Sequence, residues 1–133
     1  MISIVGLCGE IIRQTPLASA AEVRAAVENS KEAFATWSHT PPARRAQVMF
    51  KYRDLLIKNM DEIAELVSSE HGKTLDDAKG SIGRGLEVVE FACGMPHLLK
   101  GEFTEAAATG VDVHSTRQAL GVCAGITPFN FPA

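Results

Sequence analysis

The sequence has little of what cross-linked, membrane-spanning or nucleic-acid-binding proteins are built from. Its 133 residues include only three cysteines, Cys8, Cys93 and Cys123. They are odd in number and far apart, which fits reduced thiols better than a disulfide framework or a zinc site. Thirteen Lys and Arg against sixteen Asp and Glu give a net charge of -3 with no basic block, so nucleic acid is not an expected partner. No apolar run approaches the roughly 20 residues that a membrane span needs.

Two nucleotide-binding motifs are also missing. No G-x-G-x-x-G pattern occurs, and Gly121 and Gly125 have the wrong spacing for one, which excludes a self-contained dinucleotide fold. Residues 72–74, Gly-Lys-Thr, suggest a P-loop, but the motif needs a glycine where Val67 stands. A glycine helix cap followed by a new cap residue explains this tripeptide better. The four histidines have no ligand spacing, so we expect no metal site.

What the chain does contain indicates a globular protein. Hydrophobic residues make up 46% and charged residues 22%, a composition typical of one ordinary domain. The apolar start lacks the positive flank of a secretory signal and the Arg-rich pattern of a mitochondrial leader. We therefore expect a cytoplasmic location.

Apolar residues recur at helical spacing between residues 20 and 93, and cap residues divide this stretch. The predicted helices are 20–37, 41–58, 60–71 and 75–93. Their predicted caps are the Ser19–Glu22 capping box, Thr40 before two prolines, Asn59, Gly72 as a left-handed C-terminal cap, and Thr74 with Asp77. One apolar stripe along each helix should be buried, including Val27 and Trp37 in the first helix and Tyr52 and Leu55 in the second.

Strand patterns flank the helices. Residues 1–18 predict one short strand or hairpin arm. Residues 111–117 alternate apolar and polar side chains, as a half-exposed strand does. Residues 120–126 are more uniformly apolar and predict a strand that is buried on both faces.

Two residues suggest a ligand site. Arg84 stands among Gly80, Gly83 and Gly85, where small neighbours would leave its guanidinium free to bind a carboxylate. An ordinary exposed arginine explains the pattern equally well. Asn130 lies between two aromatics and two prolines, a dry setting in which its amide could stabilise an oxyanion. An Asx-type turn is the alternative, and the residues alone favour it.

Three segments carry a resemblance to a known family. Residues 70–73 (EHGK), 80–90 (GSIGRGLEVVE) and 120–132 (LGVCAGITPFNFP) are similar, in order and spacing, to the aldehyde dehydrogenase superfamily. Within it they look most like the CoA-acylating methylmalonate-semialdehyde dehydrogenases. The likeness covers roughly residues 17–133, whereas residues 1–16 depart from it. Ala119 stands where the family usually has proline.

The resemblance implies an incomplete α/β fold of the aldehyde dehydrogenase type. Residues 1–18 would be an atypical amino-terminal strand or arm, and residues 19–100 the helical part of the amino-terminal domain. Residues 101–133 would hold strands of the oligomerisation arm, the first strand of the nucleotide-binding sheet and a truncated active-site loop. The family oxidises methylmalonate or malonate semialdehyde with NAD, releases carbon dioxide and passes the acyl group to coenzyme A.

The resemblance also implies roles for single residues and for the chain as a whole. Asn130 would be catalytic, holding the oxyanion. Ile126, Thr127, Pro128 and Phe129 would contact NAD, and Arg84 and Phe131 the substrate. The nucleophilic cysteine would lie beyond Ala133, so we expect a fragment of a homo-oligomeric enzyme that is inactive alone and binds NAD and coenzyme A poorly. The alternative is a non-enzymatic helical module that associates with full-length subunits.

Overall fold

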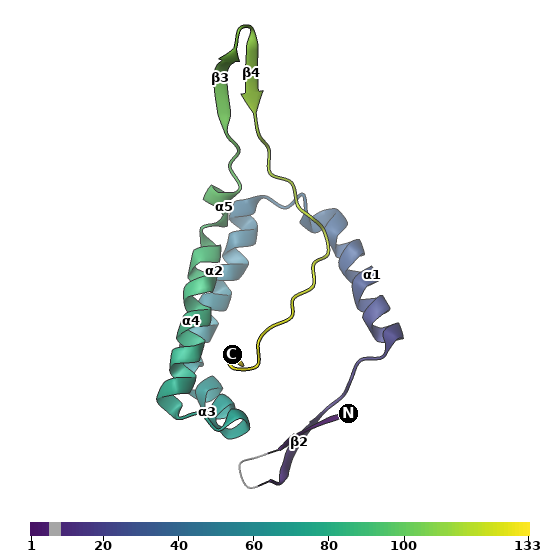
Figure 1. Ribbon diagram of the computed structural model, residues 1–133, viewed down its shortest axis with the longest axis vertical. Coiled ribbons are helices and arrows are strands. Elements are labelled where there is room, and N and C mark those ends of the chain that lie inside the picture. Colours follow the sequence, from purple (N-terminus) through teal and green to yellow (C-terminus); the bar gives the residue numbers. More distant parts are fainter. Residues whose placement is uncertain (6–8) are drawn as a thin grey trace.

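The computed structural model describes residues 1–5 and 9–133 as an α/β arrangement of helices and two separate hairpins (Figure 1). The elements are β1 (Ile2–Val5), β2 (Ile11–Thr15), α1 (Ala20–Trp37), α2 (Pro42–Lys58), α3 (Met60–His71), α4 (Leu75–Cys93), α5 (Met95–Leu98), β3 (Phe103–Ala108) and β4 (Val111–His114). The four predicted helices are confirmed to within one residue at each end. The short α5, which follows Gly94, was not predicted.

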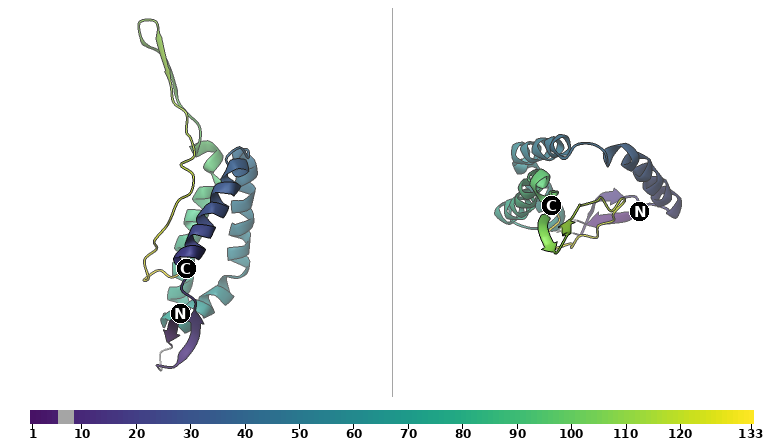
Figure 2. Two further views of the ribbon diagram at one scale, coloured as in Figure 1. Left: turned by 90° about the vertical axis from the view of Figure 1, so that its right-hand side faces the viewer. Right: turned by 90° about the horizontal axis from the view of Figure 1, so that it is seen from above.

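Figure 1 shows α2, α3 and α4 as one group, with α1 standing apart from them. The C-terminal segment descends between α1 and this group and ends beside α3 and α4. Figure 2 shows the β3–β4 hairpin projecting well beyond the helices. The chain is therefore an open frame in which the segment after β4 is covered by few neighbours.

Three of the predicted caps are confirmed because each depends only on residues a few positions away. The Glu22 N–H donates to the Ser19 hydroxyl at 3.3 Å, and the Ser19 N–H donates to the Glu22 carboxylate at 2.7 Å. Thr74 accepts the Asp77 N–H at 3.2 Å. Gly72 ends α3 in the left-handed conformation with φ +79°, which a side chain would disfavour.

The cap predicted for α2 is wrong, and the one predicted for α3 is confirmed in position but not in its side-chain bond. The Thr40 hydroxyl donates to the Thr36 carbonyl at 3.3 Å, and Pro41 is the N-cap of α2. Asn59 is the N-cap residue of α3, but its side-chain amide donates to the Leu55 carbonyl at 2.8 Å and makes no bond to α3. In both cases the side chain bonds back to the last turn of the preceding helix, whose carbonyls lack intrahelical partners.

The core is small and lies where α3 meets α4. Ala64, Ala78 and Ile82 are buried, and Met60, Ile63 and Val67 pack against them. The two alanines have no exposed surface, and their small side chains let the helix backbones approach closely. Ion pairs on the surface join α4 to both of its neighbours, from Lys79 to Asp61 of α3 at 2.7 Å and from Glu90 to Arg53 of α2 at 2.8 Å.

The predicted burial of the other apolar stripes is wrong. Val27 and Trp37 of α1 and Tyr52 and Leu55 of α2 are all exposed. They do lie on one face of their helices, as the periodicity indicates, but the described elements cover these faces only in part and leave the four side chains 40–56% exposed. Periodicity therefore located the apolar side chains correctly but could not tell whether anything packs on them.

The hairpins follow the strand predictions in part. The arm expected within residues 1–18 is an antiparallel pair, β1 with β2; Cys8 lies outside the described residues. The strand predicted at 111–117 ends earlier, at His114, and pairs with β3, which was not predicted. An alanine run is a poor strand signal. Ala106 has φ +52°, and its N–H donates to the Asp112 carboxylate at 2.7 Å at an irregularity in the register.

The strand predicted at 120–126 is absent, and its burial is wrong as well. This segment has no strand assignment, and the side chains of Leu120 and Ile126 are almost wholly exposed. A strand needs a neighbouring strand to pair its backbone N–H and C=O groups, and no strand among residues 1–5 and 9–133 lies beside this segment. Val122 and Cys123 instead face the apolar side of α1, across recesses lined by Val23, Ala26, Phe34 and Trp37.

The capping box makes α1 sensitive to acid. The backbone N–H of Ser19, and then its hydroxyl, bond the Glu22 carboxylate and lower its pKa from the ordinary value of 4.5. The stabilisation is therefore present above pH 4.5 and is lost as the pH falls through the lower pKa of the folded state. We expect the helical circular dichroism of the parent chain to fall more between roughly pH 5 and pH 3 than that of Glu22→Gln. Equal falls would show that the box does not act through the charged carboxylate, and Glu32→Gln is the control.

A buried hydroxyl on α4 lowers stability. Ser81 is only 2% exposed, and its Oγ has no partner among the described residues. We expect Ser81→Ala to raise the free energy of unfolding by about 1 kcal/mol, since it removes an unpaired polar group from a helix. Ser68→Ala is the matched control, because it removes a hydroxyl that is bonded, and it should lower the same quantity by about 1 kcal/mol. Urea unfolding measures both, and a destabilised Ser81→Ala chain would contradict this.

Candidate functional site

The candidate site begins at the corner between α3 and α4. The Gly72 N–H donates to the Ser68 carbonyl at 2.9 Å, and the part-buried Ser68 hydroxyl donates to the Lys73 carbonyl at 2.7 Å. Thr74 then caps α4 through Asp77. Each residue of the turn is held by a bond to one of the two helices. The corner is therefore a fixed platform, with His71 on one side of Gly72 and Lys73 on the other.

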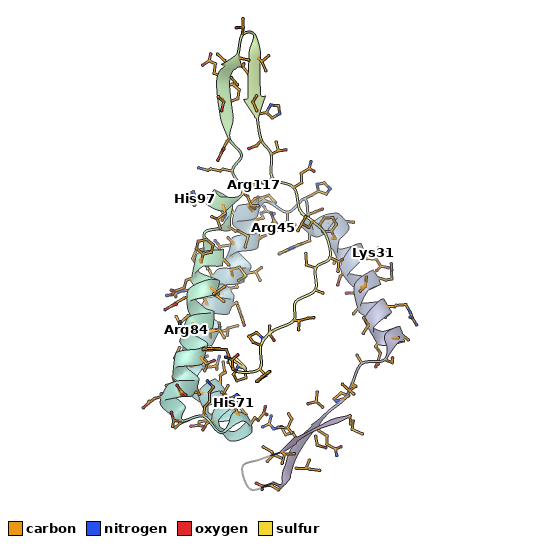
Figure 3. The ribbon with its side chains drawn as sticks, in the orientation of Figure 1. Lys31, Arg45, His71, Arg84, His97 and Arg117 are labelled. Carbon is orange, nitrogen blue, oxygen red and sulfur yellow. The ribbon has the colours of Figure 1, made fainter. Side chains whose placement is uncertain are left out.

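The segment after Ile126 reaches this platform. His71 Nε2 lies 3.2 Å from the Phe129 carbonyl oxygen, and because a carbonyl only accepts, Nε2 is the nitrogen that donates. Lys73 Nζ lies 5.2 Å from the centre of the Phe131 ring, within cation–π range. Phe131 is 44% exposed and Phe129 is 91% exposed. Figure 3 shows His71 at the end of α3 beside the C-terminal segment.

Asn130 stands between these two contacts. It lines an open recess of about 570 Å³ together with His71, Lys73, Asp77 and Phe131. The prediction of a dry aromatic setting is wrong, since Asn130 and Phe129 are both exposed to solvent. Two aromatic neighbours in sequence do not enclose an amide when one of them points into water. The carboxamide is nevertheless accessible to a ligand from the recess.

Arg84 lies higher on α4 and is exposed (Figure 3). Among the described residues it makes no ion pair and no side-chain hydrogen bond. Its neighbour Gly85 faces the end of the chain, where an added Cβ would lie 3.8 Å from the Ala133 carbonyl oxygen. An added Cβ at Gly80 or Gly83 would meet nothing within 4 Å, so close packing in this chain does not explain those two glycines.

An apolar recess lies between α4 and the end of the C-terminal segment. It measures about 370 Å³ and is lined by Tyr52, Leu56, Ile63, Ile82, Gly85, Val89 and Ala133. The structure thus brings the segment that carries Asn130 against the helix that carries Arg84. It shows no direct contact between the two residues.

The predicted cofactor residues share one stretch of backbone. Ile126, Thr127, Pro128 and Phe129 follow one another along the segment, and all four are exposed. No sequence pattern predicted that His71 contacts Phe129 or that Lys73 contacts Phe131. Gly72-Lys73-Thr74 is indeed a helix cap, as predicted. The side chains on either side of Gly72 also contact the segment, and no spacing in the sequence signals a contact across 58 residues.

The described part of the chain offers few other reactive groups. Cys93 is buried at the end of α4, and Cys123 is exposed with its Sγ 3.7 Å from the Gly121 carbonyl oxygen. Within residues 1–5 and 9–133, no three metal-ligating side chains gather at one point. None of the helices described combines the length and apolar character that crossing a bilayer requires.

Comparison with known proteins decides the family. Residues 5–133 match the sequence profile of the aldehyde dehydrogenase family. The chain belongs to this family. The match begins at residue 5, earlier than the residue 17 expected from the sequence, and therefore includes most of the β1–β2 hairpin.

Several members of the aldehyde dehydrogenase family are similar to the chain over most of its length. It is 48% identical to malonate-semialdehyde dehydrogenase of Pseudomonas aeruginosa, covering 94% of this chain and 25% of that protein. It is 51% identical to the acylating, mitochondrial methylmalonate-semialdehyde dehydrogenase of Arabidopsis thaliana, covering 93% and 20%. A crystal structure of a proposed methylmalonate-semialdehyde dehydrogenase of Sinorhizobium meliloti, complexed with NAD, superimposes with a TM-score of 0.91 at 55% identity, covering 98% and 27%. The chain spans about a quarter of the length of these relatives.

The placement of residues 120–126 outside any sheet makes a prediction for the thiols. Cys123 is exposed and Cys93 is buried, and reaction with a thiol reagent requires access. In a Cys8→Ser background we expect the exposed Cys123 to react with a disulfide reagent faster than the buried Cys93, by roughly tenfold or more. Removing Cys123 by Cys123→Ser should abolish the fast phase. Equal, slow rates for both thiols would mean that the segment is covered.

Proposed function

We propose that this chain supplies the substrate-orienting residues of an NAD-dependent, CoA-acylating dehydrogenase of methylmalonate or malonate semialdehyde. The observation that carries the proposal is the meeting of two elements: the loop with Asn130 rests on the α3–α4 corner, and its end contacts α4 one residue from Arg84. The similarity to the Pseudomonas and Arabidopsis dehydrogenases supports the choice of substrate.

Arg84 is the residue proposed to select the substrate. A semialdehyde of this class carries a carboxylate at one end and an aldehyde at the other. The exposed guanidinium of Arg84 has no acidic partner among the described residues, so its five donors are available to a carboxylate. The apolar recess beside Gly85 would accept the carbon chain.

Asn130 is the residue proposed to act on the reacting carbonyl. Its amide N–H would donate to the aldehyde oxygen as that oxygen gains negative charge. A donor that is already fixed in place gives this stabilisation without reorganising during the reaction. The open recess would have to be closed by substrate, cofactor or further protein for the bond to reach full strength, because a fixed dipole acts most strongly away from water.

The stretch 126–129 fits a bound NAD in its chemistry. Ile126 and Phe129 offer exposed apolar surface, Thr127 offers a hydroxyl, and Pro128 keeps the backbone extended. When bound, NAD accepts the hydride from the substrate. The residues of this chain would hold one side of the cofactor and leave the carbonyl within reach of Asn130.

The positions of the two described thiols support a nucleophile from another part of the enzyme. Cys93 is buried, and Cys123 lies on the α1 side of the segment, so neither is offered as the nucleophile. We propose that the nucleophile comes from outside these 133 residues and that the chain alone has no turnover.

Residues 19–100 would form the helical part of the enzyme's amino-terminal domain and 101–133 its arm and active-site loop. The exposed Phe103, Val111 and Val113 of the projecting hairpin support association between subunits.

Replacing Arg84 tests the proposed substrate. The assay uses a hybrid subunit in which this chain replaces the matching segment of the Pseudomonas relative. Losing a charge-assisted bond costs about 1.5–3 kcal/mol, so Arg84→Leu should lower kcat/KM for methylmalonate semialdehyde by roughly one to two powers of ten. The value for propanal, which has no carboxylate, should stay nearly unchanged, and Arg84→Lys should retain part of the preference. An Arg84→Leu enzyme with the parent ratio of the two substrates would rule the role out.

A further inference from the structure

The structure assigns a role to two residues that no spacing in the sequence singles out: we propose that His71 and Lys73 are positioning residues that hold the loop 129–131 and thereby aim Asn130. The inference deepens the proposed function and rests on it only for the catalytic role of Asn130. The holding itself rests only on contacts within this chain.

The loop has few other supports. Residues 127–133 belong to no helix or strand, and all of them are exposed. The His71 contact to the Phe129 carbonyl is the one side-chain hydrogen bond that the described residues make to this loop. The Lys73 contact to the Phe131 ring is a second attachment, through a different kind of interaction. The two contacts lie immediately before and immediately after Asn130.

The two supporting residues are themselves fixed. Gly72 separates them and adopts a left-handed conformation that ends α3. The part-buried Ser68 hydroxyl holds the Lys73 carbonyl at 2.7 Å, and Thr74 starts α4 in the next position. A further ion pair, from Arg13 of β2 to Glu70 at 3.3 Å, attaches the residue before His71 to the first hairpin. A rigid turn can transmit its position to a loop only through side chains that reach it, and His71 and Lys73 are those that do.

Each of the two contacts restrains one flank of Asn130. The hydrogen bond to the Phe129 carbonyl restrains the peptide that joins Phe129 to Asn130, which limits rotation of the Asn130 backbone. The ammonium over the Phe131 face restrains the other flank, and it also covers the ring, which is half as exposed as that of Phe129. With both flanks held, the Asn130 carboxamide is kept toward the recess that it shares with Lys73 and Asp77.

The experiment measures the order of the loop in the 133-residue chain by NMR relaxation of the backbone amides of 129–131. In the parent chain we expect order parameters of about 0.85, the value of rigid backbone. In the double variant His71→Leu, Lys73→Met we expect values below about 0.6. His71→Gln should restore the order, because its amide can donate to the same carbonyl. Lys73→Arg should do the same, because it keeps a cation over the ring.

Two controls separate positioning from general stability. Lys79→Met removes a lysine that pairs with Asp61 of α3 instead of contacting the loop, and it should leave the loop order unchanged. The midpoint of urea unfolding should be the same for His71→Leu and His71→Gln. Loop order parameters that are already low in the parent, or that do not differ between Leu and Gln at position 71, would overturn the inference. Since the readout is loop order and not activity, a failed Arg84 assay would count against the proposed function alone.

Discussion

The turn at residues 72–74 is the constraint on which the rest of the candidate site depends. One left-handed glycine ends α3, and one threonine begins α4 two residues later. This short connection sets the angle at which the two helices meet, and Ala64 and Ala78 can then approach with no exposed surface. The same turn presents His71 and Lys73 to the C-terminal segment. It also starts α4, whose Gly85 faces the end of that segment. One local feature therefore supports both the loop of Asn130 and the helix of Arg84, the two residues proposed to bind the substrate.

The parts of the structure that the sequence predicted are those that local physics decides. Helix bounds, the Ser19–Glu22 box, the Gly72 cap and the Thr74 cap all depend on residues within one turn of the chain. Thr40 and Asn59 show the limit even here, because a cap side chain can bond to the helix behind it as well as to the one ahead. Sequence alone does not rank these two choices.

The parts that could not be predicted depend on distant partners. Residues 120–126 have the composition of a buried strand, but a strand exists only beside another strand, and the described residues provide none. The apolar faces of α1 and α2 are only partly covered for a similar reason. At the candidate site, Arg84 and Asn130 were predicted from their motifs and stay predictions. The contacts of His71 and Lys73 could not be predicted, since they join residues that are 58 positions apart in the chain.

The proposed division of roles between Arg84 and Asn130 can be observed directly with a ligand. Malonate resembles the semialdehyde, with one carboxylate in common and the second standing for the aldehyde carbon and oxygen. A crystal structure of the hybrid subunit with NAD and malonate should place one carboxylate within hydrogen-bonding distance of the Arg84 guanidinium and the other within reach of the Asn130 amide. A malonate held by other residues, with Arg84 still exposed to solvent, would contradict the proposed site.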